Sequence, residues 1–281
     1  MNQILATGAT GNLGRAVVTS LAAKGYKVKA AARNLARTAF PAGVETVRFD
    51  YQDPATIDPA LQGVAGLFLV APPLDSNAPS KLNPVIDQAK VTGVKHVVLI
   101  SAFGVDAVEQ APLRRIERHL MASGLNYTIL RPNFFMENFS TGFLAAMVKQ
   151  GGIYLAAGDG KTSFISVAYI AEIAASAFQQ GLFGKEYSLT GPEALDHTTA
   201  TGILSQVTGK KIVYHPLTEE AMFQGMRQNG LPESTIQYMG VLYGAVRAGY
   251  TAAITKDVET VTGREPLSFL AFARQSAAVW A

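Results

Sequence analysis

A glycine-rich turn near the start of the chain constrains the fold more than any other feature. Gly8, Gly11 and Gly14 follow the apolar run 4–6 and lead into a helical pattern over 15–24. Strand, glycine turn and helix in this order let a pyrophosphate approach free backbone N–H groups at the positive end of a helix dipole. The alternative is a purely structural turn, and the spacing differs slightly from the commoner GxGxxG. The pattern predicts a dinucleotide phosphate site on Gly8, Thr10, Gly11, Asn12, Leu13 and Gly14.

The first half of the chain alternates short apolar runs with helical patterns. Strands are expected at 4–7, 27–32, 45–49, 66–71, 96–101 and 127–131. Helices are expected near 14–24, 54–62, 80–92 and 112–123. Continuous apolar strands that alternate with helices are typical of a parallel sheet covered on both faces.

The pattern changes after about residue 132. Helices are expected at 134–150, 197–208, 219–229 and 233–248, with short strands near 163–167, 186–190 and 211–215. We predict an α/β fold, a doubly wound parallel (Rossmann) sheet with a smaller, mostly helical C-terminal lobe. Residues 1–133 plus about 155–190 would form the dinucleotide-binding domain, and about 134–154 plus 191–281 the small substrate-binding lobe.

Composition excludes several classes of function. The net charge of +3, without a run of Lys or Arg, argues against a nucleic-acid partner. The chain has no cysteine, and its four histidines lack metal-ligand spacing, so we expect no metal site. The apolar stretch 66–71 is too short to cross a membrane, and no signal peptide is visible. We expect a cytoplasmic monomer or homodimer.

The end of the second strand predicts which dinucleotide binds. An acidic residue usually holds the ribose 2′-hydroxyl there, about twenty residues past the glycine turn. This chain has Arg33 instead, with Arg37 nearby. An arginine attracts a 2′-phosphate and can donate two parallel hydrogen bonds. The position therefore favours NADPH over NADH, the alternative being a solvated arginine pair.

The next two strand ends would complete the cofactor site. Asp50 and Tyr51 close the third strand, where an acid can accept from the adenine amino group and a ring can lie beside the base. Val70, Ala71 and Pro72 end the fourth strand and suit the ribose and pyrophosphate wall. An Asp that caps the following turn, and a proline that merely ends a strand, explain the same residues.

With these residues in view, the chain resembles the NmrA-like atypical short-chain dehydrogenase/reductase family. Within that family it is similar to NAD(P)H-dependent quinone oxidoreductases and to triphenylmethane or azo dye reductases. The resemblance covers nearly the whole chain and rests on 8–14, Arg33-Asn34, 93–101, 124–134, Glu137-Asn138 and 207–213. It implies a nicotinamide near Ser101, Pro132 and Phe134, and a substrate pocket with Phe103, Asn133, Phe135 and Asn138.

The chain departs from the wider superfamily where a Tyr-x-x-x-Lys pair would donate a proton and bind the ribose. Segment 108–119 has neither residue, although Arg114 or Arg115 could take the lysine's place on the ribose. Glu117 is interpreted as part of a solvated helical face, and His119 as a weaker candidate for a substrate contact. Tyr169 stands where relatives usually carry Asp.

The sequence therefore predicts hydride transfer from NADPH to a quinone or a related electron-poor aromatic acceptor, without that proton donor. Such an acceptor takes hydride directly, and water can protonate the product. The alternative is a non-catalytic NADP-sensing regulator of the NmrA type. The absence of the Tyr-x-x-x-Lys pair is equally consistent with such a regulator.

Overall fold

The computed structural model describes residues 3–35 and 39–280, so Arg37 lies outside the described residues. The chain divides into two compact units. Unit 1 comprises Met1–Pro73, Asn77–Pro132 and Val167–Ser188. Unit 2 comprises Leu74–Ser76, Asn133–Ser166 and Leu189–Ala281. Residues 155–166, expected in the dinucleotide-binding domain, are thus in unit 2.

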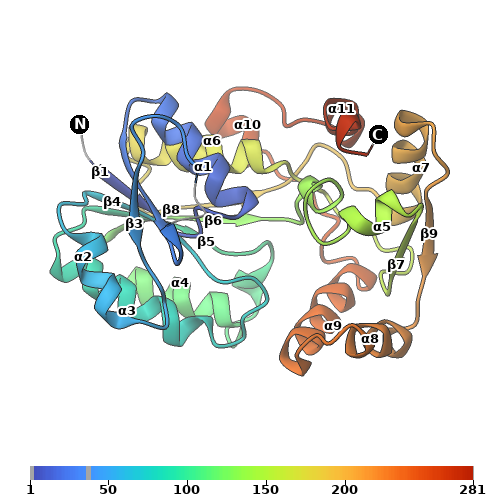
Figure 1. Cartoon of the computed structure of the whole chain (residues 1–281), viewed down its shortest axis with the longest axis horizontal. Coiled ribbons are helices and arrows are strands. Elements are labelled where there is room, and N and C mark those ends of the chain that lie inside the picture. Colours follow the sequence, from blue (N-terminus) through green and yellow to red (C-terminus); the bar gives the residue numbers. More distant parts are fainter. Residues whose placement is uncertain (1–2, 36–38, 281) are drawn as a thin grey trace. The chain divides into compact units, whose positions relative to one another are not determined.

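A seven-stranded sheet organises unit 1, in the order β3-β2-β1-β4-β5-β6-β8 (Figure 1). The strands are β1 (Gln3–Ala6), β2 (Lys27–Ala32), β3 (Glu45–Arg48), β4 (Gly66–Val70), β5 (His96–Ile100), β6 (Asn126–Pro132) and β8 (Lys185–Leu189). Neighbours from β3 to β6 pair in parallel. The order reverses between β1 and β4, where open α/β sheets bind ligands beyond the carboxyl ends of their strands. The predicted doubly wound parallel sheet is confirmed.

Helices cover both faces of this sheet (Figure 1). One face carries α1 (Asn12–Ala23) and α6 (Val167–Gln180), and the other carries α2 (Ile57–Leu61), α3 (Ala78–Val91) and α4 (Pro112–Ala122). On the second face, Leu99 and Ile129 of the strands and Ile116 and Leu120 of α4 are fully buried. After α3, Gly93 has a φ of +82°, and Val94 N–H donates to Ala89 at 2.9 Å, which ends the helix.

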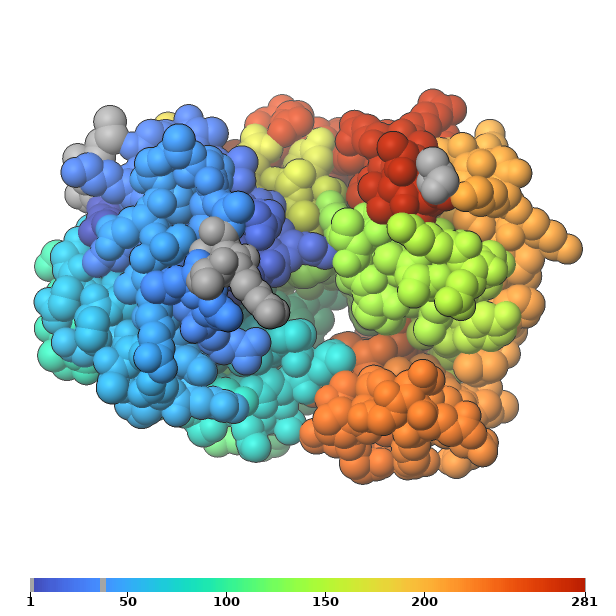
Figure 2. All heavy atoms as spheres, in the orientation of Figure 1, coloured from blue at the N-terminus to red at the C-terminus, as the bar shows by residue number. Residues whose placement is uncertain are grey.

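Unit 2 is mostly helical around a small parallel pair of strands, β7 (Gly152–Leu155) and β9 (Val213–Pro216). Its helices are α5 (Ala145–Lys149), α7 (His197–Thr208), α8 (Glu219–Gln228), α9 (Glu233–Arg247), α10 (Asp257–Thr262) and α11 (Phe269–Gln275). Figure 2 shows α8 and α9 as one orange layer. Within the described ranges, no helix is long and apolar enough to cross a membrane.

Two predicted elements of unit 2 are wrong. The expected helix 134–150 is broken into a 3₁₀ turn, Met136–Asn138, and α5. The cause is that the N–H groups of Ser140, Thr141 and Gly142 all donate to the carbonyl of Glu137. The expected strand near 163–167 forms only isolated bridges, Phe135 with Ile165 and Thr162 with Leu195.

An aromatic core holds unit 2 together and encloses a histidine. Trp280 is 1% exposed, and its indole N–H donates to the carbonyl of Phe139 at 2.9 Å. His197 is 2% exposed beside the rings of Phe164 and Tyr214, whose centroids lie 5.8 and 5.3 Å from its own. Burial lowers the pKa of His197 from 6.5 to about 4. The folded protein therefore keeps this imidazole neutral well below the pH at which the unfolded chain protonates it.

This burial predicts acid-sensitive stability. Because the pKa of His197 is depressed on folding, its penalty is absent above about pH 6.5 and grows as pH falls towards about 4. At about pH 5 it should cost unit 2 about 2 kcal/mol relative to about pH 8. His197→Phe should remove that loss in urea denaturation followed by fluorescence. An equal loss in the variant would contradict the assignment.

Candidate functional site

The predicted phosphate turn forms the entry to α1. Gly11 is the residue before the helix, with φ −83° and ψ 169°, and its N–H donates to the carbonyl of Gly8 at 3.0 Å. No side chain caps the helix, and its first turn has no acidic residue. Gly8, Thr10, Gly11 and Asn12 are exposed. The positive end of α1 is therefore presented to an incoming anion.

The packing of this turn excludes a side chain at two of its three glycines and tolerates one at the third. A Cβ at Gly14 would lie 2.1 Å from the carbonyl oxygen of Gly8, so the backbone itself excludes a side chain. Gly8 has a φ of +62°, and its Cβ would lie 2.6 Å from Val70 Cγ1. A Cβ at Gly11 would meet no protein atom nearer than 3.5 Å. The protein's own packing would therefore tolerate a side chain at Gly11, so a glycine at this position fits the close approach of a pyrophosphate.

Side chains, rather than the sheet alone, fix the strand end opposite this turn. The Tyr51 hydroxyl donates to the carbonyl of Val70 at 2.7 Å, and Val70 N–H donates to Thr7 Oγ1 at 3.0 Å. Burial raises the pKa of Tyr51 above its ordinary value, so the hydroxyl stays a donor. Its hydroxyl thus braces the Val70 wall, a role that sequence analysis did not foresee.

The residues expected at the adenosine end differ in their exposure and in their partners. Arg33 directly follows β2, is exposed, and makes no hydrogen bond or ion pair to any described residue. Asp50 is half-buried, and its carboxylate accepts from the N–H of Gln52 at 3.0 Å. Asp50 therefore caps the turn after β3, as the alternative interpretation of this residue proposed.

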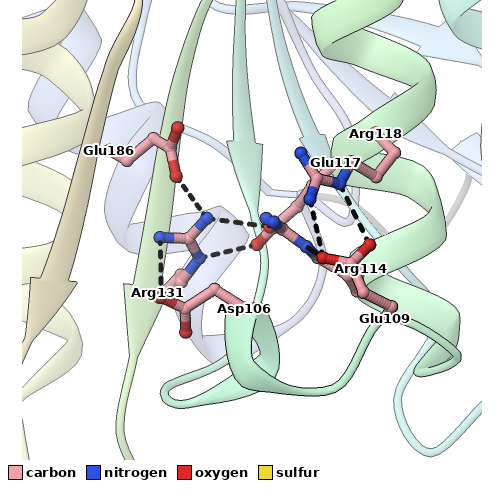
Figure 3. A network of polar contacts seen from close by, with 7 residues as sticks. All are labelled: Asp106, Glu109, Arg114, Glu117, Arg118, Arg131 and Glu186. Atoms are coloured by element: carbon pink, nitrogen blue, oxygen red, sulfur yellow. Dashed lines mark hydrogen bonds and ion pairs between the residues drawn. The ribbon is translucent and has the colours of Figure 1, made fainter.

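A buried charge cluster lies at the carboxyl ends of β5 and β6 (Figure 3). Arg131 donates from Nε and Nη2 to the two carboxylate oxygens of Glu117, both at 2.8 Å. Arg114 donates to Glu117 at 2.7 Å. Glu117 is fully buried, and Arg131 is 4% exposed. The interpretation of Glu117 as a solvated residue is wrong, because two arginines hold it inside.

Half-exposed acids surround this buried core. Glu186 of β8 accepts from Arg131, and Asp106, between β5 and α4, forms an ion pair with Arg131 at 3.6 Å (Figure 3). Glu109 pairs with Arg114 at 3.1 Å and with the exposed Arg118 at 2.7 Å. The expectation that Arg114 could bind ribose is wrong, because its guanidinium is held by these carboxylates. Arg115 is exposed.

The cluster has fixed protonation states. Burial alone would raise the pKa of Glu117, but hydrogen bonds from Arg131 and Arg114 hold it below its ordinary value. Hydrogen bonding to Glu117 raises the pKa of Arg114. The Ser101 hydroxyl is buried close to Glu117 but has no hydrogen-bond partner among the described residues. Glu117 is therefore an anion at neutral pH and cannot supply a proton there.

The segment after β6 is anchored within unit 2. The side-chain amide of Asn133 donates to Ser163 Oγ and to the carbonyl of Thr251, both at 2.8 Å, and accepts from Phe134 N–H. Its polar atoms are thus already engaged. Phe134, Phe135 and Asn138 are half-buried, and the Phe134 ring centroid lies 6.1 Å from that of Tyr243.

Sequence reasoning missed the contacts that settle two polar residues. His119 hydrogen-bonds to Asp87 at 2.7 Å, between α4 and α3, so its ring links two covering helices. Arg131 follows the apolar residues Ile129 and Leu130 near the end of β6, and that position was the available signal for a buried cation in need of a partner. Pro132 and Phe103 are brought together, because Phe103 N–H donates to the carbonyl of Pro132 at 3.0 Å.

Comparisons with known proteins agree with this geometry. The profile of a family described as NAD(P)H-binding matches residues 8–180. An NAD(P)H azoreductase of Xenophilus azovorans is 32% identical and is covered over 99% of each chain. Triphenylmethane reductase of Citrobacter sp. superposes with a TM-score of 0.85 at 25% identity, over 99% of this chain and 100% of that one. An Escherichia coli NADPH-dependent quinone oxidoreductase, solved with NADPH, superposes with a TM-score of 0.82 at 27% identity, over 98% and 99%.

Two further likenesses concern proteins not named as enzymes. Prestalk A differentiation protein A of Dictyostelium discoideum is 33% identical over 97% of this chain and 92% of that protein. NmrA, a negative transcriptional regulator solved with NAD, superposes with a TM-score of 0.78 at 14% identity, over 99% and 96%. The second likeness is one of fold alone.

Gly14 and Gly11 should differ in how much stability the protein loses when each is replaced by alanine. Gly14→Ala places a Cβ against the backbone of Gly8 and should cost about 3 kcal/mol of unfolding free energy. Gly11→Ala meets only ordinary contacts and should stay within about 1 kcal/mol of wild type. Chemical denaturation measures both. Equal losses would show that Gly11 also serves the turn's own packing.

Proposed function

The chain belongs to the NAD(P)H-binding family, and we propose that it is an oxidoreductase that transfers hydride from NADPH to a quinone or a related electron-poor aromatic acceptor. The observation that carries the proposal is the uncapped N-terminus of α1 after the glycine turn, where the protein's own packing would tolerate a side chain at Gly11. The reductases that cover nearly this whole chain are named for azo dyes, triphenylmethane dyes and quinones. They support the acceptor class.

We assign the cofactor residues by their place along the strand ends. Gly8 to Gly14 and the start of α1 would hold the pyrophosphate, and Arg33 the 2′-phosphate. Asp50 and Tyr51 would border the adenine, and Val70, Ala71 and Pro72 the ribose. The backbone at Ser101, Pro132 and Phe134 would border the nicotinamide. NADPH supplies the hydride.

The acceptor would contact Phe103, Phe135 and Asn138, with Asn133 holding the Phe134 backbone in place. Aromatic side chains suit a flat ring and keep water from it. Glu117 is held as an anion, so it donates no proton. A quinone accepts hydride without an enzyme acid, and solvent protonates the product. The protein's contribution is orientation and a dry surface.

The alternative remains an NADP-sensing regulator. It is favoured by the segment 108–119, which has no Tyr-x-x-x-Lys pair, and by Glu117 being locked in ion pairs. A regulator would bind both NADPH and NADP⁺ and would turn over no acceptor. Steady-state oxidation of NADPH separates the two functions.

We predict that Arg33 selects NADPH. Its guanidinium has no partner among the described residues, so it is available for a 2′-phosphate. Arg33→Asp should weaken NADPH binding by roughly 1.5–3 kcal/mol and spare NADH. Arg33→Lys, which keeps the charge but loses the bidentate geometry, should weaken it less. Fluorescence titrations that show an unchanged preference in Arg33→Asp would refute the assignment.

We also predict that the wild type oxidises NADPH with 1,4-naphthoquinone or a triphenylmethane dye, with little change in rate around neutral pH. Gly11→Val should abolish cofactor binding in a folded protein, because its side chain would occupy the pyrophosphate space. Absorbance at the NADPH band follows turnover, and circular dichroism checks folding. A wild type that binds NADPH but reduces no acceptor would establish the regulator instead.

A further inference from the structure

One buried arginine ties together four parts of unit 1. Arg131 lies on β6, and its carboxylate partners come from α4, from β8 and from the loop between β5 and α4 (Figure 3). Those partners are Glu117, Glu186 and Asp106. The guanidinium is planar and rigid, so each contact also fixes a direction. Backbone hydrogen bonds already join β6 to β5 and β8, and the ion pairs add a fixed orientation for α4, which otherwise packs on the strands through apolar residues.

Stability alone does not account for this arrangement. The neighbouring inward positions of α4, Ile116 and Leu120, are apolar and fully buried against Leu99 and Ile129. An apolar pair at Glu117 and Arg131 would continue that core. Burying an ion pair costs desolvation, and apolar replacements of such pairs are often neutral or stabilising. What the ion pair adds over an apolar pair is defined geometry.

That geometry is concentrated at two backbone segments. Ser101 N–H donates to the carbonyl of Leu130 at 2.8 Å, and Phe103 N–H to that of Pro132 at 3.0 Å, so residues 101–103 follow the end of β6. Arg131 lies between these two carbonyls in the chain, and Glu117 lies beside the Ser101 hydroxyl. The cluster therefore braces, from the α4 side, the spacing that these backbone hydrogen bonds give residues 101–103 and Pro132.

We propose that Glu117 and Arg131 are positioning residues for the nicotinamide end of the cofactor site. The inference rests on the proposed function, which assigns the nicotinamide to the backbone at Ser101 and Pro132. The pair touches neither cofactor nor acceptor. It holds the two backbone segments at the spacing that presents the ring for hydride transfer, in the helix where relatives of the wider superfamily carry their proton donor.

The test replaces the pair by apolar residues of similar size, Glu117→Leu with Arg131→Met. The double variant should keep its melting temperature near that of wild type, because Arg114 keeps Glu109 as its partner, and the acids that lose Arg131 are half-exposed. It should bind 2′,5′-ADP, which has no nicotinamide, as wild type does. Its kcat with 1,4-naphthoquinone should fall by about a hundredfold, with a larger isotope effect from NADPH deuterated at C4.

Two milder variants guard the test against misfolding. Glu186→Gln removes one half-exposed partner of Arg131, and we expect it to lower kcat by about tenfold. Arg118→Met is the matched control, because Arg118 is 55% exposed and its hydrogen bonds within the described part of the chain go to the outer Glu109. It should leave kcat and the isotope effect unchanged.

The outcomes separate this inference from the proposed function. A wild type without acceptor turnover refutes the proposed function, yet NADPH can still be titrated against 2′,5′-ADP. In that case the pair is tested by whether the double variant loses the extra affinity that the nicotinamide provides. A stable double variant with wild-type turnover, isotope effect and NADPH affinity would overturn the positioning role and leave the cluster purely structural.

Discussion

The close approach of Gly14 to the carbonyl of Gly8 sets the geometry on which the rest of unit 1 depends. A Cβ at residue 14 would lie 2.1 Å from that oxygen, so β1 can turn into α1 only if this residue is glycine. The tight turn directs the N-terminus of α1 to the carboxyl edge of the sheet. Val70 contacts the same turn, and Tyr51 and Thr7 hold Val70. The exposed N-terminus of α1, where we propose the phosphate site, is thus a consequence of backbone packing.

The opposite end of the same edge is held by charge. Arg131 and Glu117 extend the face that carries Leu99 and Ile129, near the carboxyl end of β6. Apolar contacts fill space there but specify direction weakly, whereas a bidentate ion pair specifies both distance and angle. Two different interactions therefore fix the carboxyl edge of the sheet. Steric exclusion fixes the glycine turn after β1, and directed hydrogen bonds fix the ends of β5 and β6.

Local patterns in the sequence were enough to predict the sheet, because each strand and glycine stop is encoded within a few residues. The turn at Gly8–Gly14 was predicted for the same reason. The burial of Glu117 could not be predicted in this way. A charged residue on an amphipathic helix is expected to face solvent, and its partner Arg131 lies fourteen residues away on β6. The helix 134–150 failed because Glu137 draws three N–H groups into a turn. The residues proposed to bind the cofactor and acceptor stay predictions.

The protonation states at α4 limit the chemistry that this helix can support. Its inward polar residues are an anion whose pKa is lowered and an arginine whose pKa is raised, each held by the other. Neither can exchange a proton near neutral pH, and moving Glu117 out of the cluster would leave Arg131 buried beside fewer carboxylates. A substrate whose reduction needs a proton in the same step would find no donor in the Glu117–Arg114–Arg131 cluster. An acceptor that takes hydride alone has no such need. The buried ion cluster is therefore compatible with the quinone-type acceptor that we propose.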